Sequence, residues 1–119
     1  MSRIALLTAG LVAALALAAP IGATSSVTKL TGTVGPGFTI TLKKGTAKVK
    51  TLKAGSYRIT VNDKSKIHDF HRTGPGVNKM ITTTPFKGTK TVTVKLKKGT
   101  YRYVCDPHAS VMKGSFKVT

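Results

Sequence analysis

The segment from Cys105 to Met112 (sequence CDPHASVM) carries three side chains with metal-donor atoms within eight consecutive residues. They are the thiol of Cys105, the imidazole of His108 and the thioether of Met112. Sulfur ligands of these two kinds are soft donors that suit copper, and imidazole suits copper as well. A second imidazole would complete a set of two histidines and one cysteine with a weak axial methionine, and we expect His68 to supply it. The sequence therefore predicts a site for one copper ion.

Short runs of alternating apolar and polar residues must hold these side chains in place. Alternation with period two is typical of β-strands, and no stretch after residue 23 shows a convincing helical period of 3.6. Seven or eight short strands in a chain of this length favour an all-β, antiparallel β-sandwich. The segment Ile67–Pro85 contains two prolines and two glycines and alternates little after Phe70, so we expect a long loop there. The predicted strands cover residues 27–34, 38–42, 47–50, 57–61, 92–96, 101–105 and 116–118.

The strand that leads to the cysteine is the most informative of these. Tyr101, Tyr103 and Cys105 alternate along it, so their side chains should point to one face. We expect the two tyrosines in the core, the thiol pointing inward, and the Tyr101 hydroxyl holding a neighbouring loop as a tyrosine corner. The segment 96–102 (LKKGTYR) also resembles the segment 52–58 (LKAGSYR), which indicates two similar strand starts in the two halves of the sandwich.

Two segments of the chain resemble the cupredoxins, the family of plastocyanin, amicyanin and pseudoazurin. The first is 68–70 (HDF), which is similar to the segment that carries the first copper ligand in that family. The second is 99–108 (GTYRYVCDPH), followed by 112–114 (MKG). The resemblance implies a Greek-key β-sandwich of about eight strands with one copper ion at its end. It implies His68, Cys105 and His108 as in-plane ligands, Met112 as the axial ligand, and one-electron transfer between larger redox proteins.

The resemblance also implies how electrons reach the copper. In relatives the second histidine, here His108, meets solvent within an apolar patch and serves as the electron port. The residues expected around it are Pro107, Ala109, Val111, Pro75 and Val77, with Pro107 directly beside the ligands.

Three departures from the family pattern concern the surroundings of the ligands. Three residues separate His108 from Met112, whereas relatives commonly have two or four. Asp69 stands where relatives have an asparagine that donates hydrogen bonds between the two ligand loops, and an ionised carboxylate only accepts them. Asp106 follows Cys105, where serine or threonine is usual. We expect the two carboxylates to face each other, with one protonated or with a lysine or arginine between them, and the reduction potential to depend on pH.

The balance of charge indicates the partners. The chain has 119 residues, with 20 Lys+Arg against 3 Asp+Glu, and a net charge of +17. Many lysines are typical of a solvated sheet face, but the near absence of acids favours anionic partners. We expect an acidic redox protein as partner, and an anionic membrane or envelope surface as a further one. Few aromatic residues and the lack of a binding motif argue against nucleic acid. A single cysteine excludes an intramolecular disulfide, and we expect a monomer.

The first 23 residues are typical of a secretory signal peptide. A positive start is followed by the apolar run Ile4–Ala19 and by small residues up to Ala23, after which we expect cleavage, with a competing site at 16–18. The run has 16 residues, fewer than the ~20 that span a bilayer. Residues 24–119 are then one exported domain, in the periplasm or at the cell exterior.

Other interpretations fit parts of the sequence. An exported copper carrier or scavenger would use the same ligands without a redox partner. A metal-free basic β-sandwich that binds anionic envelope polymers would leave Cys105 as an inert buried thiol. Met112 is alternatively a core residue, as we expect Met80 to be, and His71 is expected at the surface or beside the ligands. No nucleophile and base occur in a pattern that indicates an enzyme.

Overall fold

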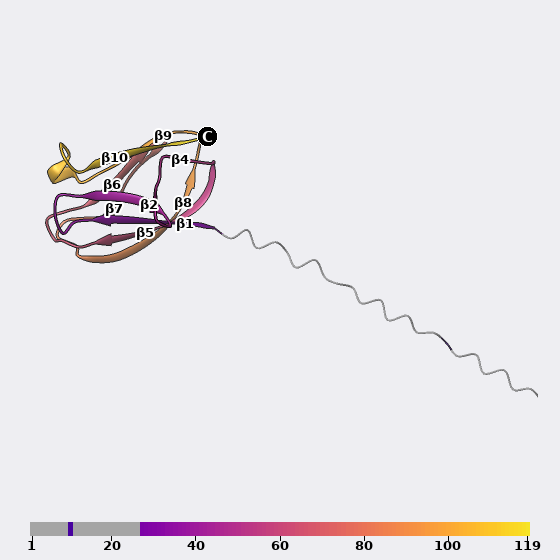
Figure 1. The fold of residues 1–119 in the computed structure, drawn as a ribbon, viewed down its shortest axis with the longest axis horizontal. Coiled ribbons are helices and arrows are strands. Elements are labelled where there is room, and N and C mark those ends of the chain that lie inside the picture. The colour runs from indigo at the N-terminus through magenta and orange to yellow at the C-terminus, as the bar shows by residue number, and fades with distance from the viewer. Residues whose placement is uncertain (1–9, 11–26) are drawn as a thin grey trace, which may run out of the picture.

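The structure, a computed structural model, describes residue 10 and residues 27–119. Apart from residue 10, the predicted signal peptide lies outside the described residues, as does its cleavage site. Residues 27–119 form two five-stranded β-sheets packed face to face (Figure 1). In the part of the chain that is described, no helix is long and apolar enough to cross a membrane.

The first sheet has the strand order β3-β2-β1-β5-β8, and the second has the order β4-β10-β9-β6-β7. Eight strands have five residues or more, in agreement with the predicted number, and β3 and β4 have two residues each. The strands of the first sheet are β1 (Thr28–Val34), β2 (Ile40–Lys44), β3 (Ala47–Lys48), β5 (Gly55–Asp63) and β8 (Gly88–Leu96). Those of the second are β4 (Thr51–Leu52), β6 (Phe70–Gly74), β7 (Val77–Thr82), β9 (Gly99–Val104) and β10 (Lys113–Val118). One turn of 3₁₀-helix, η1 (Asp106–His108), follows β9.

Period-two alternation builds the core between the sheets, as predicted. Along β5, Tyr57, Ile59 and Val61 are buried while Ser56 and Arg58 are exposed. Because successive side chains of a strand point to opposite faces, each sheet buries one face and leaves the other to solvent. The buried apolar residues of the first sheet are Leu30, Val34, Ile40, Leu42, Tyr57, Ile59, Val61, Val94 and Leu96, and those of the second are Leu52, Phe70, Ile81, Tyr101, Tyr103, Phe116 and Val118.

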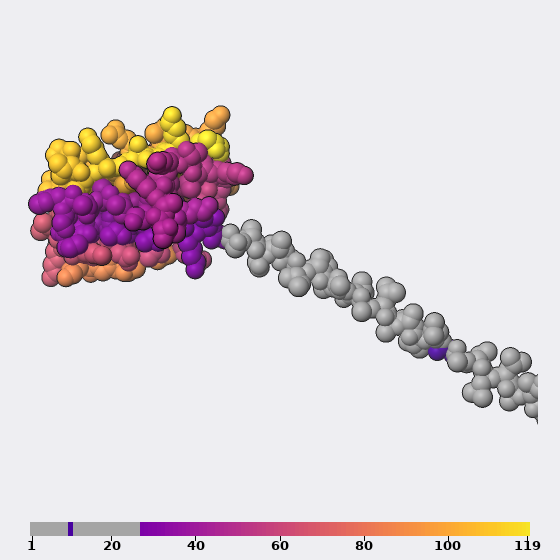
Figure 2. All heavy atoms as spheres, in the orientation of Figure 1, coloured from indigo at the N-terminus to yellow at the C-terminus, as the bar shows by residue number. Residues whose placement is uncertain are grey.

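The expectation of a purely antiparallel sandwich is wrong for two strand pairs. β1 pairs with β5 in parallel, and β4 pairs with β10 in parallel. The cause is the path of the chain, which passes to the second sheet at β4 before it returns to the first at β5. β1 and β5 therefore meet as neighbours without a hairpin between them. Figure 2 shows the connecting segment, coloured magenta, lying across one side of the sandwich.

The expected long loop at 67–85 is wrong as well, because the hairpin β6–β7 occupies most of it. A register irregularity between Phe70 and His71 interrupts the alternation of β6. β7 is an edge strand whose residues Asn78, Lys79 and Met80 are all exposed, so it lacks a regular apolar face. The turn uses Gly76 with a φ of +66°, a conformation that glycine adopts without steric cost. The alternation of apolar and polar residues that predicts a strand is therefore missing, because β7 is an edge strand and the register of β6 is irregular.

The tyrosine corner is confirmed. The Tyr101 hydroxyl accepts a hydrogen bond from the Lys97 backbone N–H at 2.9 Å, and both Tyr101 and Tyr103 are 1% exposed. The similar segment has a matching contact, since the Tyr57 hydroxyl donates to the Lys53 carbonyl at 2.6 Å. In both places the tyrosine of a strand holds the backbone four residues before it. The internal resemblance in the sequence thus corresponds to two equivalent strand starts.

Four loops lie at one end of the sandwich. They are the β1–β2 loop (35–39), the β5–β6 loop (64–69), the β7–β8 loop (83–87) and the β9–β10 loop (105–112). Val34, Asp63 and Gly88 are paired across the first sheet at this end, and η1 lies there too, opposite the C-terminus (Figure 1). The predicted site residues belong to two of these loops, the β5–β6 loop and the β9–β10 loop.

Candidate metal centre

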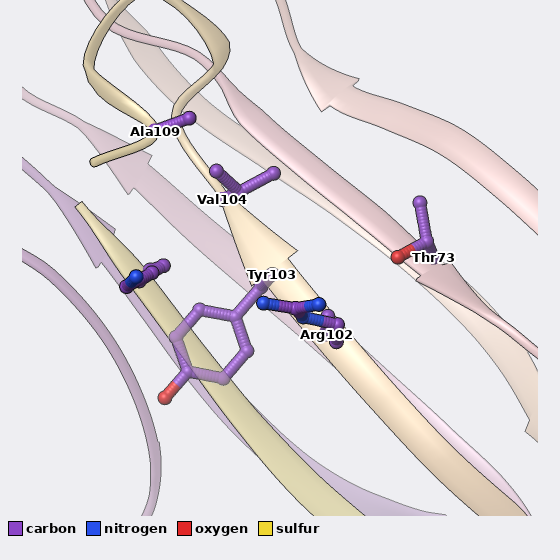
Figure 3. Close-up of a pocket in the computed structure, with 6 residues that line it drawn as sticks. Thr73, Arg102, Tyr103, Val104 and Ala109 are labelled. Carbon is purple, nitrogen blue, oxygen red and sulfur yellow. The ribbon is translucent and has the colours of Figure 1, made fainter. Parts of the chain in front are cut away.

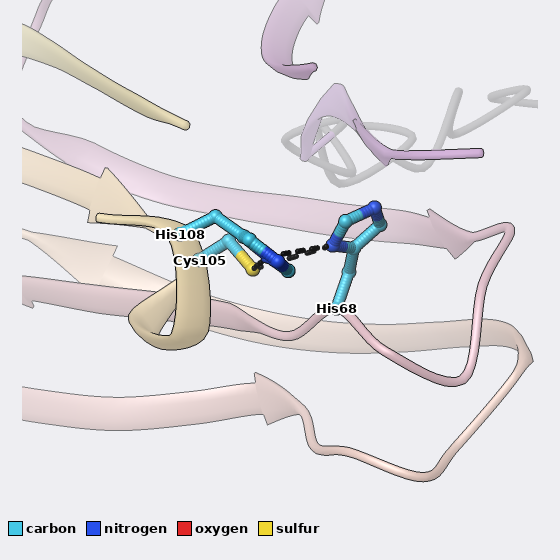
Figure 4. A group of neighbouring side chains, drawn as sticks. All are labelled: His68, Cys105 and His108. Carbon is cyan, nitrogen blue, oxygen red and sulfur yellow. Dashed lines mark hydrogen bonds between the residues drawn. The ribbon is translucent and has the colours of Figure 1, made fainter. Parts of the chain in front are cut away.

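Three side chains converge where these loops meet. Cys105 directly follows β9 and is fully buried, His108 is the last residue of η1, and His68 lies buried in the β5–β6 loop. The Cys105 Sγ is 3.6 Å from the Nδ1 atoms of both His68 and His108. The two Nδ1 atoms are 3.2 Å apart. Figure 4 shows that both imidazole rings turn a nitrogen toward the sulfur, although they come from segments 40 residues apart.

This geometry fits a bound metal ion. An ion bonded at about 2.0–2.1 Å to imidazole nitrogen and about 2.3 Å to thiolate sulfur holds such donors roughly 3–4 Å apart. The candidate donor atoms of His68, Cys105 and His108 all lie within 4.8 Å of one another. The set contains two imidazoles and a thiol but no carboxylate, which favours copper over the hard cations magnesium and calcium.

Backbone hydrogen bonds close the loop that carries Cys105, His108 and Met112. The Cys105 N–H donates to the Met112 carbonyl at 3.0 Å, and the Met112 N–H donates to the His108 carbonyl at 2.8 Å. The His108 N–H donates to the Cys105 carbonyl at 3.0 Å. The three residues between His108 and Met112 thus form one closed turn, which places Met112 in the interior with 0% exposure.

Asp69 joins the two ligand loops. Its Oδ1 accepts a hydrogen bond from the Asp106 N–H at 2.7 Å, and its own N–H faces the Cys105 Sγ at 3.5 Å. The Asp69 carboxyl therefore ties the two loops together as a hydrogen-bond acceptor. Burial raises the pKa of the Asp69 carboxyl above its usual 3.8, and the Asp106 hydrogen bond opposes this in part. Burial also raises the pKa of the Cys105 thiol.

A histidine, and not the expected lysine or arginine, contacts the second carboxylate. His71 Nδ1 lies 2.9 Å from Asp106 Oδ1, and His71 Nε2 is hydrogen-bonded to Asn78 Oδ1. Both partners are oxygen acceptors, so the protonated imidazole, with two N–H donors, fits best. The hydrogen bonds to Asn78 and Asp106 raise the pKa of His71 above its usual 6.5. His71 thus lies beside the ligands, as expected.

An aromatic side chain that the sequence did not single out covers the centre. The Phe38 ring is edge-on to His68 and His108, with ring centroids 5.8 and 4.9 Å apart. Phe38 was predicted in a strand, but β2 begins at Ile40 and leaves Phe38 in the β1–β2 loop with 60% exposure. The sequence does hold a signal for this loop position, because the Gly-Pro-Gly that precedes Phe38 is typical of a loop.

The apolar patch around His108 differs from the one expected. His108 is half-buried, and Pro107, Ala109 and Val111 are exposed in the same loop. Further exposed apolar side chains at this end are Phe38, Ile67 and, just before Gly88, Phe86. Pro75 and Val77 are not part of it, because they belong to the β6–β7 turn. A Cβ on Gly99, at the start of β9, would meet the Pro75 ring, which places Pro75 at the opposite end of the sandwich.

A groove of about 290 Å³ lies beside the η1 loop on the outer face of the second sheet. Its walls come from β6, β9, β10 and the loop itself, as Figure 3 shows. Arg102 and Lys113 line it and no carboxylate does. The groove is therefore a cationic surface next to the residue expected to pass electrons.

Residues 36–119 match the sequence profile of the copper binding proteins of the plastocyanin/azurin family. The chain belongs to this family. The fold and the site thus define a cupredoxin-type blue copper protein, of the electron-transfer class, with one copper ion as its cofactor. The family and the donor set favour a copper protein over a metal-free sandwich.

The solved structures that resemble the chain agree in fold. The copper protein rusticyanin is 22% identical over 76% of each chain, with a TM-score of 0.56. Rusticyanin variants are 25% identical over 76% of each chain, with a TM-score of 0.52. A chain of a heme-copper terminal oxidase dimer is 22% identical over 76% of this chain and 63% of that one, with a TM-score of 0.53. No curated protein gives a significant sequence match.

Proposed function

We propose that this protein is exported and carries single electrons between redox proteins, and that His68, Cys105, His108 and Met112 would hold the copper. The observation that carries the proposal is the convergence of one Sγ and two Nδ1 atoms, all within 4.8 Å of one another. Copper supplies the chemistry by cycling between Cu(II) and Cu(I). Residues 1–23, with the features of a signal peptide, support export.

The surrounding residues suit electron transfer better than catalysis. Cys105, His68 and Met112 are fully buried, so these donors would hold copper away from solvent and from a substrate. The loop hydrogen bonds keep the donors in place as the copper changes its charge, which avoids reorganisation during the transfer. His108 is the half-buried ligand and offers the route for the electron to the surface. We infer that the protein is a carrier and not an enzyme.

The partner that we propose is an acidic redox protein that docks over the apolar patch around His108. Exposed Phe38 and Val111 supply the apolar contact. Arg102 and Lys113 in the neighbouring groove offer cations for carboxylates of the partner. A second proposed partner is an anionic surface of the membrane or envelope. It would bind the opposite end of the sandwich, where the turns with Lys53, Lys97 and Lys98 lie.

Redox cycling in the presence of a Cu(I) chelator separates the electron carrier from a copper carrier. The copper-loaded protein should accept and release one electron per copper reversibly and keep its metal through repeated cycles. Loss of copper to the chelator at the first reduction would favour the copper carrier and contradict the proposal.

A further inference from the structure

Arg72 is a buried cation in the interior of the sandwich. It lies in β6, two residues after the core residue Phe70, and its side chain is 7% exposed. Lys79 of β7 is its cross-strand partner, so both side chains point to the same face of the sheet. An arginine is almost never this buried unless an anion pairs with it.

Among the described residues, no carboxylate forms an ion pair with Arg72. The three acidic residues are engaged elsewhere: Asp63 accepts from the Ser65 N–H, Asp69 from the Asp106 N–H, and Asp106 contacts His71. The Arg72 Nε is buried and has no hydrogen-bond partner among the described residues. Burial lowers the pKa of Arg72, yet a guanidinium stays protonated in proteins. An unpaired buried charge of this kind is costly.

Arg72 lines a cavity of about 230 Å³. It lies between β7 and β8, which are the edge strands of the two sheets. Arg72 and Lys79 give it a cationic part, and Ile81, Val92 and Val94 give it apolar walls. The cavity therefore combines an unsatisfied planar donor with space for a hydrocarbon group. None of its lining residues belongs to the metal centre.

We propose that this cavity binds a small monocarboxylate with a short apolar body. The carboxylate would receive two parallel hydrogen bonds from the Arg72 guanidinium, the geometry that arginine favours. Lys79 would add a second, more mobile positive charge. The apolar walls disfavour inorganic phosphate or sulfate, because most of their oxygens would be buried without donors. The competing interpretation is that inward-pointing charges only protect the β7 edge from pairing with another chain.

Calorimetric titration of the whole protein with hexanoate at constant ionic strength tests the proposal. We expect saturable binding of one hexanoate with a dissociation constant of about 1 mM, and no binding of the uncharged hexanamide. Arg72→Met should weaken hexanoate binding by roughly 10-fold to 100-fold. The control Lys117→Gln removes an exposed cation of β10 and should leave the binding unchanged.

Each other outcome would overturn the carboxylate site. These outcomes are no saturable binding, equal binding of sulfate, or equal loss in the Lys117→Gln control. In case Arg72→Met does not fold, isotope-edited NMR of the unaltered protein gives a second test. Hexanoate should shift the methyl signals of Ile81, Val92 and Val94, and shifts confined to other residues would contradict the site. Because neither test involves copper, their failure leaves the electron-transfer proposal intact.

Discussion

At the scale of single residues, Asp69 is the least usual feature of the centre. It is a carboxylate with 4% exposure that accepts a hydrogen bond from the neighbouring ligand loop. An asparagine would accept the same bond through its own Oδ1 without a buried negative charge. The carboxylate is therefore not needed for the tie itself, and its effect should be on the electrostatics of the copper.

We expect the reduction potential to fall as pH rises through the raised pKa of Asp69, because the ionised carboxylate favours Cu(II) over Cu(I). Asp69→Asn should raise the potential at neutral pH and flatten its pH dependence. A raised carboxyl pKa also costs stability above the folded-state pKa, so this variant should unfold at an equal or higher temperature at pH 7. Voltammetry and thermal denaturation over a pH series measure both. A pH-independent potential in the parent protein would contradict the expectation.

His71 has the opposite relation between pH and stability. Its pKa is raised in the folded state, so its stabilising hydrogen bonds are fully present below about pH 6.5 and are lost as pH rises through the higher, folded-state pKa. His71→Gln should therefore destabilise the protein by about 1 kcal/mol or less, and more at pH 6 than at pH 9. Urea denaturation at both pH values measures the difference. An equal loss at the two values would show that His71 is not charged in the fold.

At the scale of elements, the β1–β2 loop forms the third wall of the metal centre. Gly35 has a φ of +74°, and a Cβ there would lie 2.8 Å from Cδ2 of His68. Phe38 then turns back over both histidines. This loop is short, and a glycine allows it to approach the His68 ring closely.

Gly35→Ala should destabilise the protein by about 1–3 kcal/mol, because alanine is strained at this φ. It should also displace His68 and change the copper absorption spectrum. Gly37→Ala is the matched control, since a Cβ at Gly37 would meet nothing within 4 Å. Urea denaturation and the visible spectra of both variants test the role of the loop. Equal spectra and equal stabilities would show that the close approach of Gly35 to His68 is not needed.

The sequence predicted elements well where one face of a strand is buried. Cys105 and the tyrosines of β9 were predicted with the correct orientation because strict alternation fixes it. The hairpin β6–β7 was missed because an edge strand and an irregular register hide the alternation. The parallel pairing of β1 with β5 has no local sequence signal, since it depends on the path of the chain between the sheets.

In the metal centre, too, features with a local sequence signal were predicted and features that depend on the tertiary fold were not. His68 and His108 were predicted from residue type and spacing, and the structure brings both to Cys105. Phe38 and the contact of His71 with Asp106 were not predicted, because they depend on how three loops from distant parts of the chain meet. The sequence alone specifies donors, whereas the contacts around the donors follow from the tertiary fold.

At the scale of the whole molecule, the acidic residues are unevenly distributed. All three acidic residues, Asp63, Asp69 and Asp106, lie at the end with the metal centre. The opposite end carries lysine-containing turns at 53–54 and 97–98 and no acidic side chain. The net positive charge therefore attracts anions to the whole protein. Docking of a redox partner at His108 depends instead on the cations next to His108.

Replacing both Arg102 and Lys113 with glutamine should slow electron transfer to an acidic redox protein about tenfold at low salt. The matched control replaces Lys53 and Lys98 with glutamine, which removes the same charge from the opposite end and should have a much smaller effect. Stopped-flow rates over a series of ionic strengths measure both. Equal effects of the two double variants would mean that net charge alone guides the encounter, without a docking site at the groove.

The most direct test of the central claim is the visible absorption spectrum of residues 24–119 titrated with Cu(II), beside that of Cys105→Ser. The account predicts an intense absorption that saturates at one copper per chain and is absent in Cys105→Ser, because it arises from copper bound to the Cys105 thiolate. A blue colour would agree with a trigonal site of His68, Cys105 and His108 with axial Met112. The absence of an intense band, or its persistence in Cys105→Ser, would contradict copper ligation by Cys105 and with it the proposed electron-transfer centre.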